Sequence, residues 1–173
     1  LGANPLEPET SEAFSIGVTG SLGDIDFTLD YYSIDVASIM AKVSALSVST
    51  DPTAGAAYDR YLALVGANVA GAAGIGAASW FTSGYDVSVS GYDLVATYPI
   101  ESDLGQTDLG ITLGYNEREF DTDPSAFLNT EAQEDYVNFE PNTRMIVSIA
   151  HSWSDYMLMV RGSYWGESQN YNG

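Results

Sequence analysis

The feature that most constrains the fold of this chain is a period-two alternation of apolar residues with polar or small ones. Phe14, Ile16 and Val18, for example, alternate with Ser15, Gly17 and Thr19. Successive side chains of a β-strand point to opposite faces, so each such segment predicts a strand with one apolar face. Six segments qualify: 12–20, 24–36, 84–98, 107–121, 142–153 and 156–167. The sequence therefore predicts an all-β fold.

The connections between these segments alternate in length. Three are short, at 21–23, 99–106 and 154–155, and they alternate with two long ones, at about 37–83 and 122–141. In an antiparallel meander this places both long loops on one side, as in outer-membrane barrels with short periplasmic turns and long extracellular loops. At Tyr31–Tyr32 the alternation changes phase. That change indicates either a β-bulge or the point where the strand leaves the membrane.

Composition limits the function classes. The 173 residues carry 24 Asp and Glu against 5 Lys and Arg, a formal net charge of −19. The few cations are scattered, which argues against nucleic acid as a partner: they are Lys42, Arg60, Arg118, Arg144 and Arg161. The absence of Cys excludes disulfides and thiolate metal sites. The opening residues Leu1–Pro5 show neither an initiating Met nor a signal-peptide pattern, so we expect a longer parent protein.

The first long loop contains an uncharged stretch, 61–81, that is long enough for a membrane helix. Its many Gly and Ala residues and Asn68 make it too weakly hydrophobic for that role. We instead expect a short helix over 52–69, capped by Thr50 or Asp51 and with Pro52 in its first turn.

Several stretches resemble the late barrel strands of TonB-dependent receptors, the energy-coupled transporters of the bacterial outer membrane. Asn4–Glu12, followed by Phe14–Val18, resembles the family's Asn-Pro…Leu-x-Pro-Glu-Thr-Ser segment and the strand after it. Phe27–Val36 resembles the next strand, with its Tyr-Tyr-x-Ile-Asp run. Ser90–Tyr98 is similar to the Arg-Gly-Val-Asp-Leu strand, with Ser90 in place of Arg and Tyr92 in place of Val. Asn142–Arg144 and Tyr164–Glu167 also fit the family.

The resemblance implies that 1–173 is part of a 22-stranded barrel closed around an N-terminal plug, with a TonB-contacting segment before the plug. Six strands cannot close such a barrel, so the partners it implies are the remaining barrel strands, the plug, the TonB system, outer-membrane lipid and a small-molecule ligand. The expected function is uptake of a scarce nutrient such as a siderophore, cobalamin or an oligosaccharide. No cofactor and no catalysis are implied.

Candidate site residues are few. His151 has no Cys or second His to share a metal, so we expect a surface or interfacial histidine. No Gly-x-Ser-x-Gly elbow supports a serine nucleophile, and we expect no enzyme activity. Asp26 and Asp30 share one strand face at a spacing of four, which in a glycosidase could form an acid and base pair. In a barrel they would instead line a wet lumen or contact substrate. The acidic loop 121–140 is either a solvated loop or a Ca²⁺ site, without the EF-hand order.

Aromatic residues gather at the predicted strand ends. This placement suits the headgroup level of a membrane, although packing in a sandwich core is an alternative. The predicted girdle comprises Tyr31, Tyr98, Tyr115, Trp153, Tyr156 and Tyr164, with Tyr32 and Trp165 close by. Trp80, Phe81 and Tyr85 would line a ligand entrance at the return of the first long loop.

The rival hypothesis is a soluble or secreted acidic β-domain that binds a surface polymer or joins an assembly. Such a domain would bury its apolar strand faces in its own core, whereas a barrel wall turns them to lipid.

Overall fold

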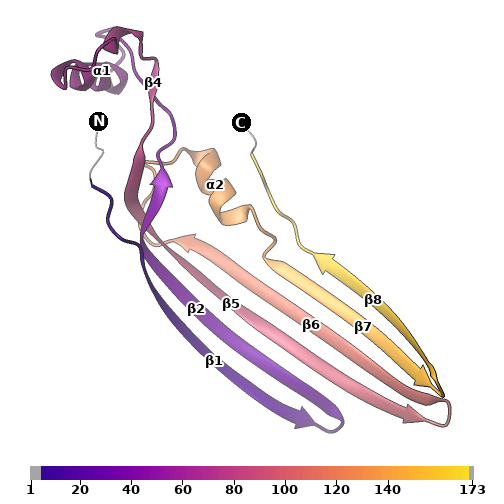
Figure 1. The fold of residues 1–173 in the computed structure, drawn as a ribbon. Coiled ribbons are helices and arrows are strands. Elements are labelled where there is room, and N and C mark those ends of the chain that lie inside the picture. Colours follow the sequence, from indigo (N-terminus) through magenta and orange to yellow (C-terminus); the bar gives the residue numbers. More distant parts are fainter. Residues whose placement is uncertain (1–4, 172–173) are drawn as a thin grey trace.

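The computed structural model describes residues 5–171. Leu1–Asn4, from which a longer parent protein and the start of the Asn-Pro segment were predicted, lie outside the described residues. Its main feature is one six-stranded antiparallel sheet, curved and strongly inclined in Figure 1, in the order β1-β2-β5-β6-β7-β8. The strands are β1 Thr10–Leu22, β2 Ile25–Lys42, β5 Phe81–Ser102, β6 Gly105–Phe120, β7 Thr143–Trp153 and β8 Tyr156–Trp165. The all-β antiparallel meander is confirmed. The sheet is open, with β1 and β8 at its edges.

The strand register divides the side chains between two faces, because directly opposite residues share a face. What we call the apolar face carries Phe14, Ile16, Val18, Ile25, Phe27, Leu29, Tyr31, Tyr92, Leu94, Ala96, Tyr98, Leu109, Ile111, Leu113, Tyr115, Met145, Val147, Ile149, Tyr156, Leu158, Val160 and Tyr164. What we call the polar face carries Gly17, Thr19, Asp26, Thr28, Asp30, Asp93, Thr97, Gly110, Thr112, Gly114, Arg144, Ser148, Arg161 and Ser163.

Of the three short turns, the predicted 154–155 is confirmed, whereas the other two are tighter than predicted. The predicted connection 99–106 is wrong in length, because β5 and β6 continue their ladder to the pair Ser102 and Gly105. Gly105 adopts a φ of 127°, which strongly favours glycine. The other two turns are also two residues long and use positive φ, at Gly23 and at Ser154.

Of the two explanations for the phase change at Tyr31–Tyr32, the bulge is wrong, because both residues pair in regular register with β1 and β5. The irregularity lies further along β2, between Val36 and Ile39, where Ser38 has a φ of 59°. An extra residue there lets the strand bend, and the Asp86 carboxylate accepts a hydrogen bond of 2.8 Å from the Ser38 N–H.

The first long connection forms a small lobe beyond the sheet, at the top of Figure 1. It holds β3 Leu46–Ser47, α1 Ala56–Gly66, the 3₁₀ turn η1 Ala72–Gly74 and β4 Ala77–Ala78. The helix is shorter than the predicted 52–69, and Gly55 rather than Thr50 or Asp51 occupies its N-cap. Asp51 instead accepts a hydrogen bond from the Thr53 N–H, which makes a turn before the helix. Within residues 5–171, no helix has the length and hydropathy to cross a bilayer.

The second long connection contains α2, Thr130–Asn138, which the sequence analysis missed. Asn129 caps it, because its side-chain oxygen accepts a hydrogen bond of 2.9 Å from the Ala132 N–H. The helix carries three acidic residues, Glu131, Glu134 and Asp135, which interrupt the apolar periodicity that would have predicted it.

Both buried apolar clusters lie outside the apolar face. One, Val48, Leu64 and Ala72, holds the first-loop lobe together. The other, Tyr85, Val87 and Leu128, joins the upper ends of the strands to the second loop. Within the described residues the sheet therefore has no core of its own over most of its area.

Candidate functional site

Within residues 5–171 nothing covers the apolar face. Side chains well exposed on it come from all six strands: Phe14, Ile16, Val18, Leu29, Tyr92, Tyr98, Ile111, Tyr115, Val147, Ile149, Tyr156, Leu158, Val160 and Tyr164. Soluble monomers rarely leave an apolar patch of more than a few hundred Å² in water. A face of this extent requires an apolar neighbour.

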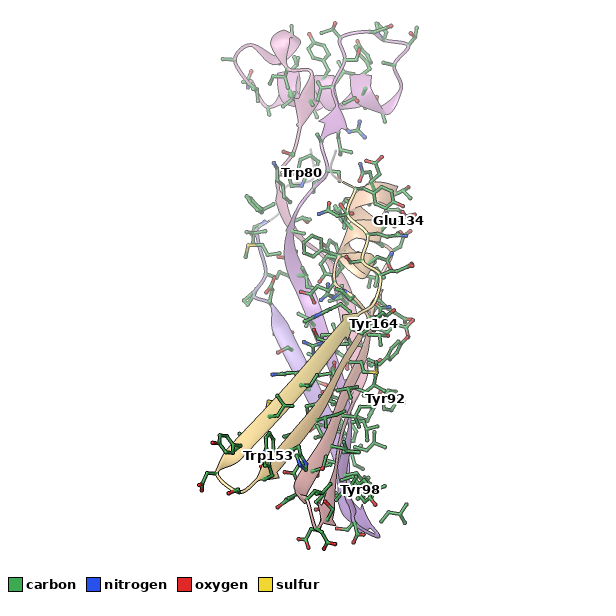
Figure 2. The ribbon with its side chains drawn as sticks, turned by 90° about the vertical axis from the view of Figure 1, so that its right-hand side faces the viewer. Trp80, Tyr92, Tyr98, Glu134, Trp153 and Tyr164 are labelled. Atoms are coloured by element: carbon green, nitrogen blue, oxygen red, sulfur yellow. The ribbon has the colours of Figure 1, made fainter. Side chains whose placement is uncertain are left out.

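Two rows of aromatic side chains bound this face. One row crosses the sheet through Tyr31, Tyr92 and Tyr115, which are direct cross-strand partners, and the Tyr31 and Tyr92 ring centroids are 5.0 Å apart. The second row lies beside the short turns, where Trp153 stacks on Tyr156 with ring centroids 6.0 Å apart. In Figure 2, Tyr98 and Trp153 lie near the turns, and Tyr92 and Tyr164 lie farther up the sheet.

Between the rows the apolar face carries no Asp, Glu, Lys or Arg, and it includes one histidine, His151. Above the first row the same strand faces become acidic: Tyr31 is followed by Ser33 and Asp35, and Tyr115 by Glu117 and Glu119. The boundary lies at the same height on β1, β2, β5 and β6, since Glu12, Asp35, Ser88 and Glu119 form one cross-strand row.

The band between the rows has the height of a membrane core. Tyr164 aligns through Met145 with Leu113, two residues from Tyr115 of the first row. The eight-residue step from Tyr156 to Tyr164 therefore covers most of the band, and it spans about 27 Å at about 3.4 Å per residue. A strand tilt of about 40° reduces this to about 21 Å, near the apolar band of about 25 Å on outer-membrane barrels.

The polar face is organised by glycines. Gly17, Asp30, Asp93, Gly114, Arg144 and Trp165 form one cross-strand row. Asp30 and Asp93 are direct neighbours, an arrangement that repulsion would disfavour. On the side away from the other carboxylate, each Asp has a glycine as its cross-strand neighbour. Asp30 lies against Gly17, and Asp93 lies against Gly114. The Arg144 guanidinium approaches Gly114 from the opposite side. The predicted pair Asp26 and Asp30 does share this polar face.

The second loop folds over the polar side of the upper strands. Val36, Val87 and Phe120 continue the parity of the polar face and pack with Phe127 and Tyr136 of the loop, among other residues. Gly84 admits the Phe127 ring, since a Cβ at Gly84 would lie 2.7 Å from it. Burial, aided by the neighbouring Tyr136, raises the pKa of Tyr85 to about 12.

Arg118 fixes the helix of this loop. Its guanidinium donates to the Tyr136 carbonyl at 3.0 Å and to the Glu140 carboxylate at 3.3 Å, and it lies 5.5 Å from the Tyr136 ring centroid. A cation at the C-terminal end of a helix also interacts favourably with its dipole. Ser44 ties the two long loops together through its N–H, which donates to the Phe127 carbonyl at 2.8 Å.

The structure separates the three residues expected at a ligand entrance. Trp80 and Phe81 lie on the stem of the first-loop lobe, and Figure 2 shows Trp80 there. Phe81 is exposed, whereas the indole N–H of Trp80 is buried and has no partner within residues 5–171. Tyr85 is only 3% exposed and packs beneath the second loop, which leaves it no surface for a ligand.

The candidate metal and titratable residues have mostly local roles. His151 shares a 2.9 Å hydrogen bond with the Thr107 hydroxyl and stacks on Trp153. Asp123 accepts a hydrogen bond from the Ser125 N–H, which lowers the pKa of its carboxyl group. Among residues 5–171, no three His, Asp or Glu side chains gather in an arrangement that could hold a metal ion.

Sequence reasoning missed Tyr92, the link between Tyr31 and Tyr115 in the aromatic row. Its parity with Tyr98 was the available signal, because residues six apart share a strand face. Tyr32 and Trp165, placed near the girdle by sequence, lie on the polar face instead.

Comparison of the chain with models of known protein families, with curated protein sequences and with solved structures gave no match.

Proposed function

We propose that residues 1–173 form part of the wall of an outer-membrane β-barrel, in a TonB-dependent transporter that takes up a scarce nutrient such as a siderophore, cobalamin or an oligosaccharide. The observation that carries the proposal is the uncovered apolar face, bounded by two aromatic rows and flanked by acidic residues. Lipid is the neighbour that matches the chemistry and height of this band.

Burial energetics favour lipid over water. Transfer of apolar surface out of water contributes about 25 cal/mol per Å². The exposed Leu158 and Val160 of β8 gain nothing from a protein core, since within residues 5–171 no element packs on their face. A bilayer supplies the apolar contact that this sheet lacks.

The polar face supports a transport role. In a closed barrel it would face the lumen, and Asp30, Asp93 and Arg144 would line a wet interior. The second loop lies on that side of the upper strands, so it would narrow the mouth of the lumen. The resemblance to TonB-dependent receptors supports this choice among barrels, with the remaining strands, the plug and the TonB system as partners.

The rival soluble β-domain has less support. A sandwich requires a second layer about 10 Å from the apolar face. Within the described residues the second sheet is only the pair β3 and β4, which belongs to the first-loop lobe.

The test uses neighbouring residues on opposite faces of β6. Ile111 lies mid-band on the apolar face and Thr112 on the polar face. In the full-length protein inserted into lipid vesicles, we expect Ile111→Arg to lower the free energy of unfolding by about 2–4 kcal/mol, the cost of a lipid-facing Arg near the midplane. Thr112→Arg should change it by less than about 1 kcal/mol, because a lumen-facing cation stays hydrated. Equal effects of the two substitutions would overturn the wall assignment.

A further inference from the structure

A polar pocket of about 400 Å³ lies where α2, β7 and the segment after β8 meet. It is lined by Asn138, Asn142, Thr143, Gly166, Glu167, Ser168 and Gln169. Two backbone hydrogen bonds hold its walls together: the Gly166 N–H donates to the Thr143 carbonyl at 2.8 Å, and the Gln169 N–H to the Asn138 carbonyl at 2.9 Å. The walls are thus fixed by main-chain contacts, which leaves the side chains for other partners.

The lining side chains have one kind of chemistry. Three are amides, two are hydroxyls and one is a carboxylate. Amides and hydroxyls both donate and accept hydrogen bonds, and a carboxylate accepts them. Within the described residues 5–171, none of the six side chains takes part in a side-chain hydrogen bond. The pocket therefore offers a dense set of unused neutral donors and acceptors.

The charges select against ionic ligands. None of the lining residues is Lys or Arg, and the single ionisable group, Glu167, is acidic. A net charge of −19 adds a repulsive field for anions. One carboxylate is too few for a hard cation, which takes six or more oxygen ligands. An uncharged ligand with many hydroxyl groups matches this lining.

The residue that precedes the pocket segment in sequence is aromatic. Trp165 directly precedes Gly166 and is 57% exposed. One side of its indole is near the Arg144 guanidinium, 5.9 Å from the ring centroid. Sugar rings present C–H faces that pack on aromatic rings, while their hydroxyls bond to amides and carboxylates.

We propose that the pocket at Asn138, Asn142 and Gln169 binds a neutral oligosaccharide. The assignment rests on the proposed transporter and selects one of its three substrate classes. It places recognition at the long-loop side of the sheet, next to the helix that covers the upper strands.

The experiment measures binding of named sugars to the full-length protein in detergent. The panel contains the neutral oligosaccharides maltoheptaose, cellohexaose, mannohexaose and xylohexaose, with oligogalacturonate as the anionic comparison. Affinity for the tightest neutral sugar is then measured by calorimetry. We expect the double variant Asn142→Ala/Gln169→Ala to bind it about 30-fold more weakly, since each lost neutral hydrogen bond weakens binding about fivefold.

The control variant is Asn68→Gly/Gln106→Ala, which removes one Asn and one Gln far from the pocket. Glycine fits the φ of 54° at position 68. Unchanged affinity in the control, with a loss in the pocket variant, supports the assignment. Preference for oligogalacturonate, no neutral sugar bound, or equal losses in both variants would overturn it. If the two Arg substitutions on β6 still differ, such a failure removes the pocket assignment and leaves the barrel wall intact.

Discussion

At the scale of single residues, glycines on the polar face decide how close its large polar side chains can approach the sheet. The Tyr32 ring lies across Gly91, where an added Cβ would be 2.6 Å from the Tyr32 hydroxyl and would also meet the Tyr115 carbonyl. Asp30 and Asp93 use Gly17 and Gly114 in the same way. The glycines of the polar face therefore leave room for the side chains of their cross-strand neighbours.

This arrangement predicts a strong effect of one methyl group. Gly91→Ala should lower the free energy of unfolding by about 1–3 kcal/mol, the usual cost of overpacking. Gly162→Ala is the matched control, because a Cβ there meets nothing within 4 Å. It should be neutral or slightly stabilising. Urea unfolding of both variants in vesicles measures the difference, and a neutral Gly91→Ala would contradict the packing of Tyr32.

At the scale of elements, α2 is stabilised by contacts at both ends. Asn129 caps its start, and Arg118 of β6 holds its last turn. The segment after β8 adds a further contact, since the Tyr171 N–H donates to the Asp135 carboxylate. A short acidic helix has little stability of its own, so these contacts fix it over the polar side.

Arg118 makes three contacts with the second loop: to the Tyr136 carbonyl, the Tyr136 ring and the Glu140 carboxylate. Arg118→Ala should destabilise the loop by about 1.5–3 kcal/mol, the range for hydrogen bonds to a charged group. We expect faster amide exchange across 121–141 with the strands unchanged. Arg118→Lys should recover little of the loop stability lost in Arg118→Ala, because an ammonium group cannot reproduce the planar arrangement of guanidinium donors. Arg161→Ala, at an exposed position on β8, serves as the control. Unchanged exchange in Arg118→Ala would mean that the apolar cluster alone holds the loop.

At the scale of the whole molecule, the part of the sheet that the structure describes has open edges at β1 and β8 and an apolar face that no described element covers. An open edge presents unpaired backbone donors and acceptors, which other strands readily join. Every residue of β8 is exposed, including Met157 and Met159 on its polar side. In the proposed barrel wall, further strands would pair with both edges.

Residues 1–173 produced alone should therefore aggregate in detergent-free buffer. The uncovered face and the free edges would associate between copies. Size-exclusion chromatography with light scattering tests this, with the full-length protein in detergent as the comparison. A stable, monodisperse monomer without detergent would favour the soluble β-domain and contradict the wall proposal.

The sequence by itself determined the strands, their order and the two chemistries of their faces. Alternation such as Ile25, Phe27 and Leu29 against Asp26 and Thr28 is a local property with a period of two, so it can be read without knowing any contact. The alternation of short and long connections was also visible, and it yielded the antiparallel meander. The resemblance to TonB-dependent receptors suggested the nutrient uptake that we propose.

Only the tertiary structure decided what depends on contacts between distant residues. The cross-strand register aligned Tyr31, Tyr92 and Tyr115 in one row, which no single strand reveals. The bulge at Ser38 depends on the Asp86 carboxylate, and α2 depends on Arg118. Burial of Tyr85 beneath the second loop has the same origin. Local periodicity cannot encode these features, because their free energy comes from partners far away in the chain.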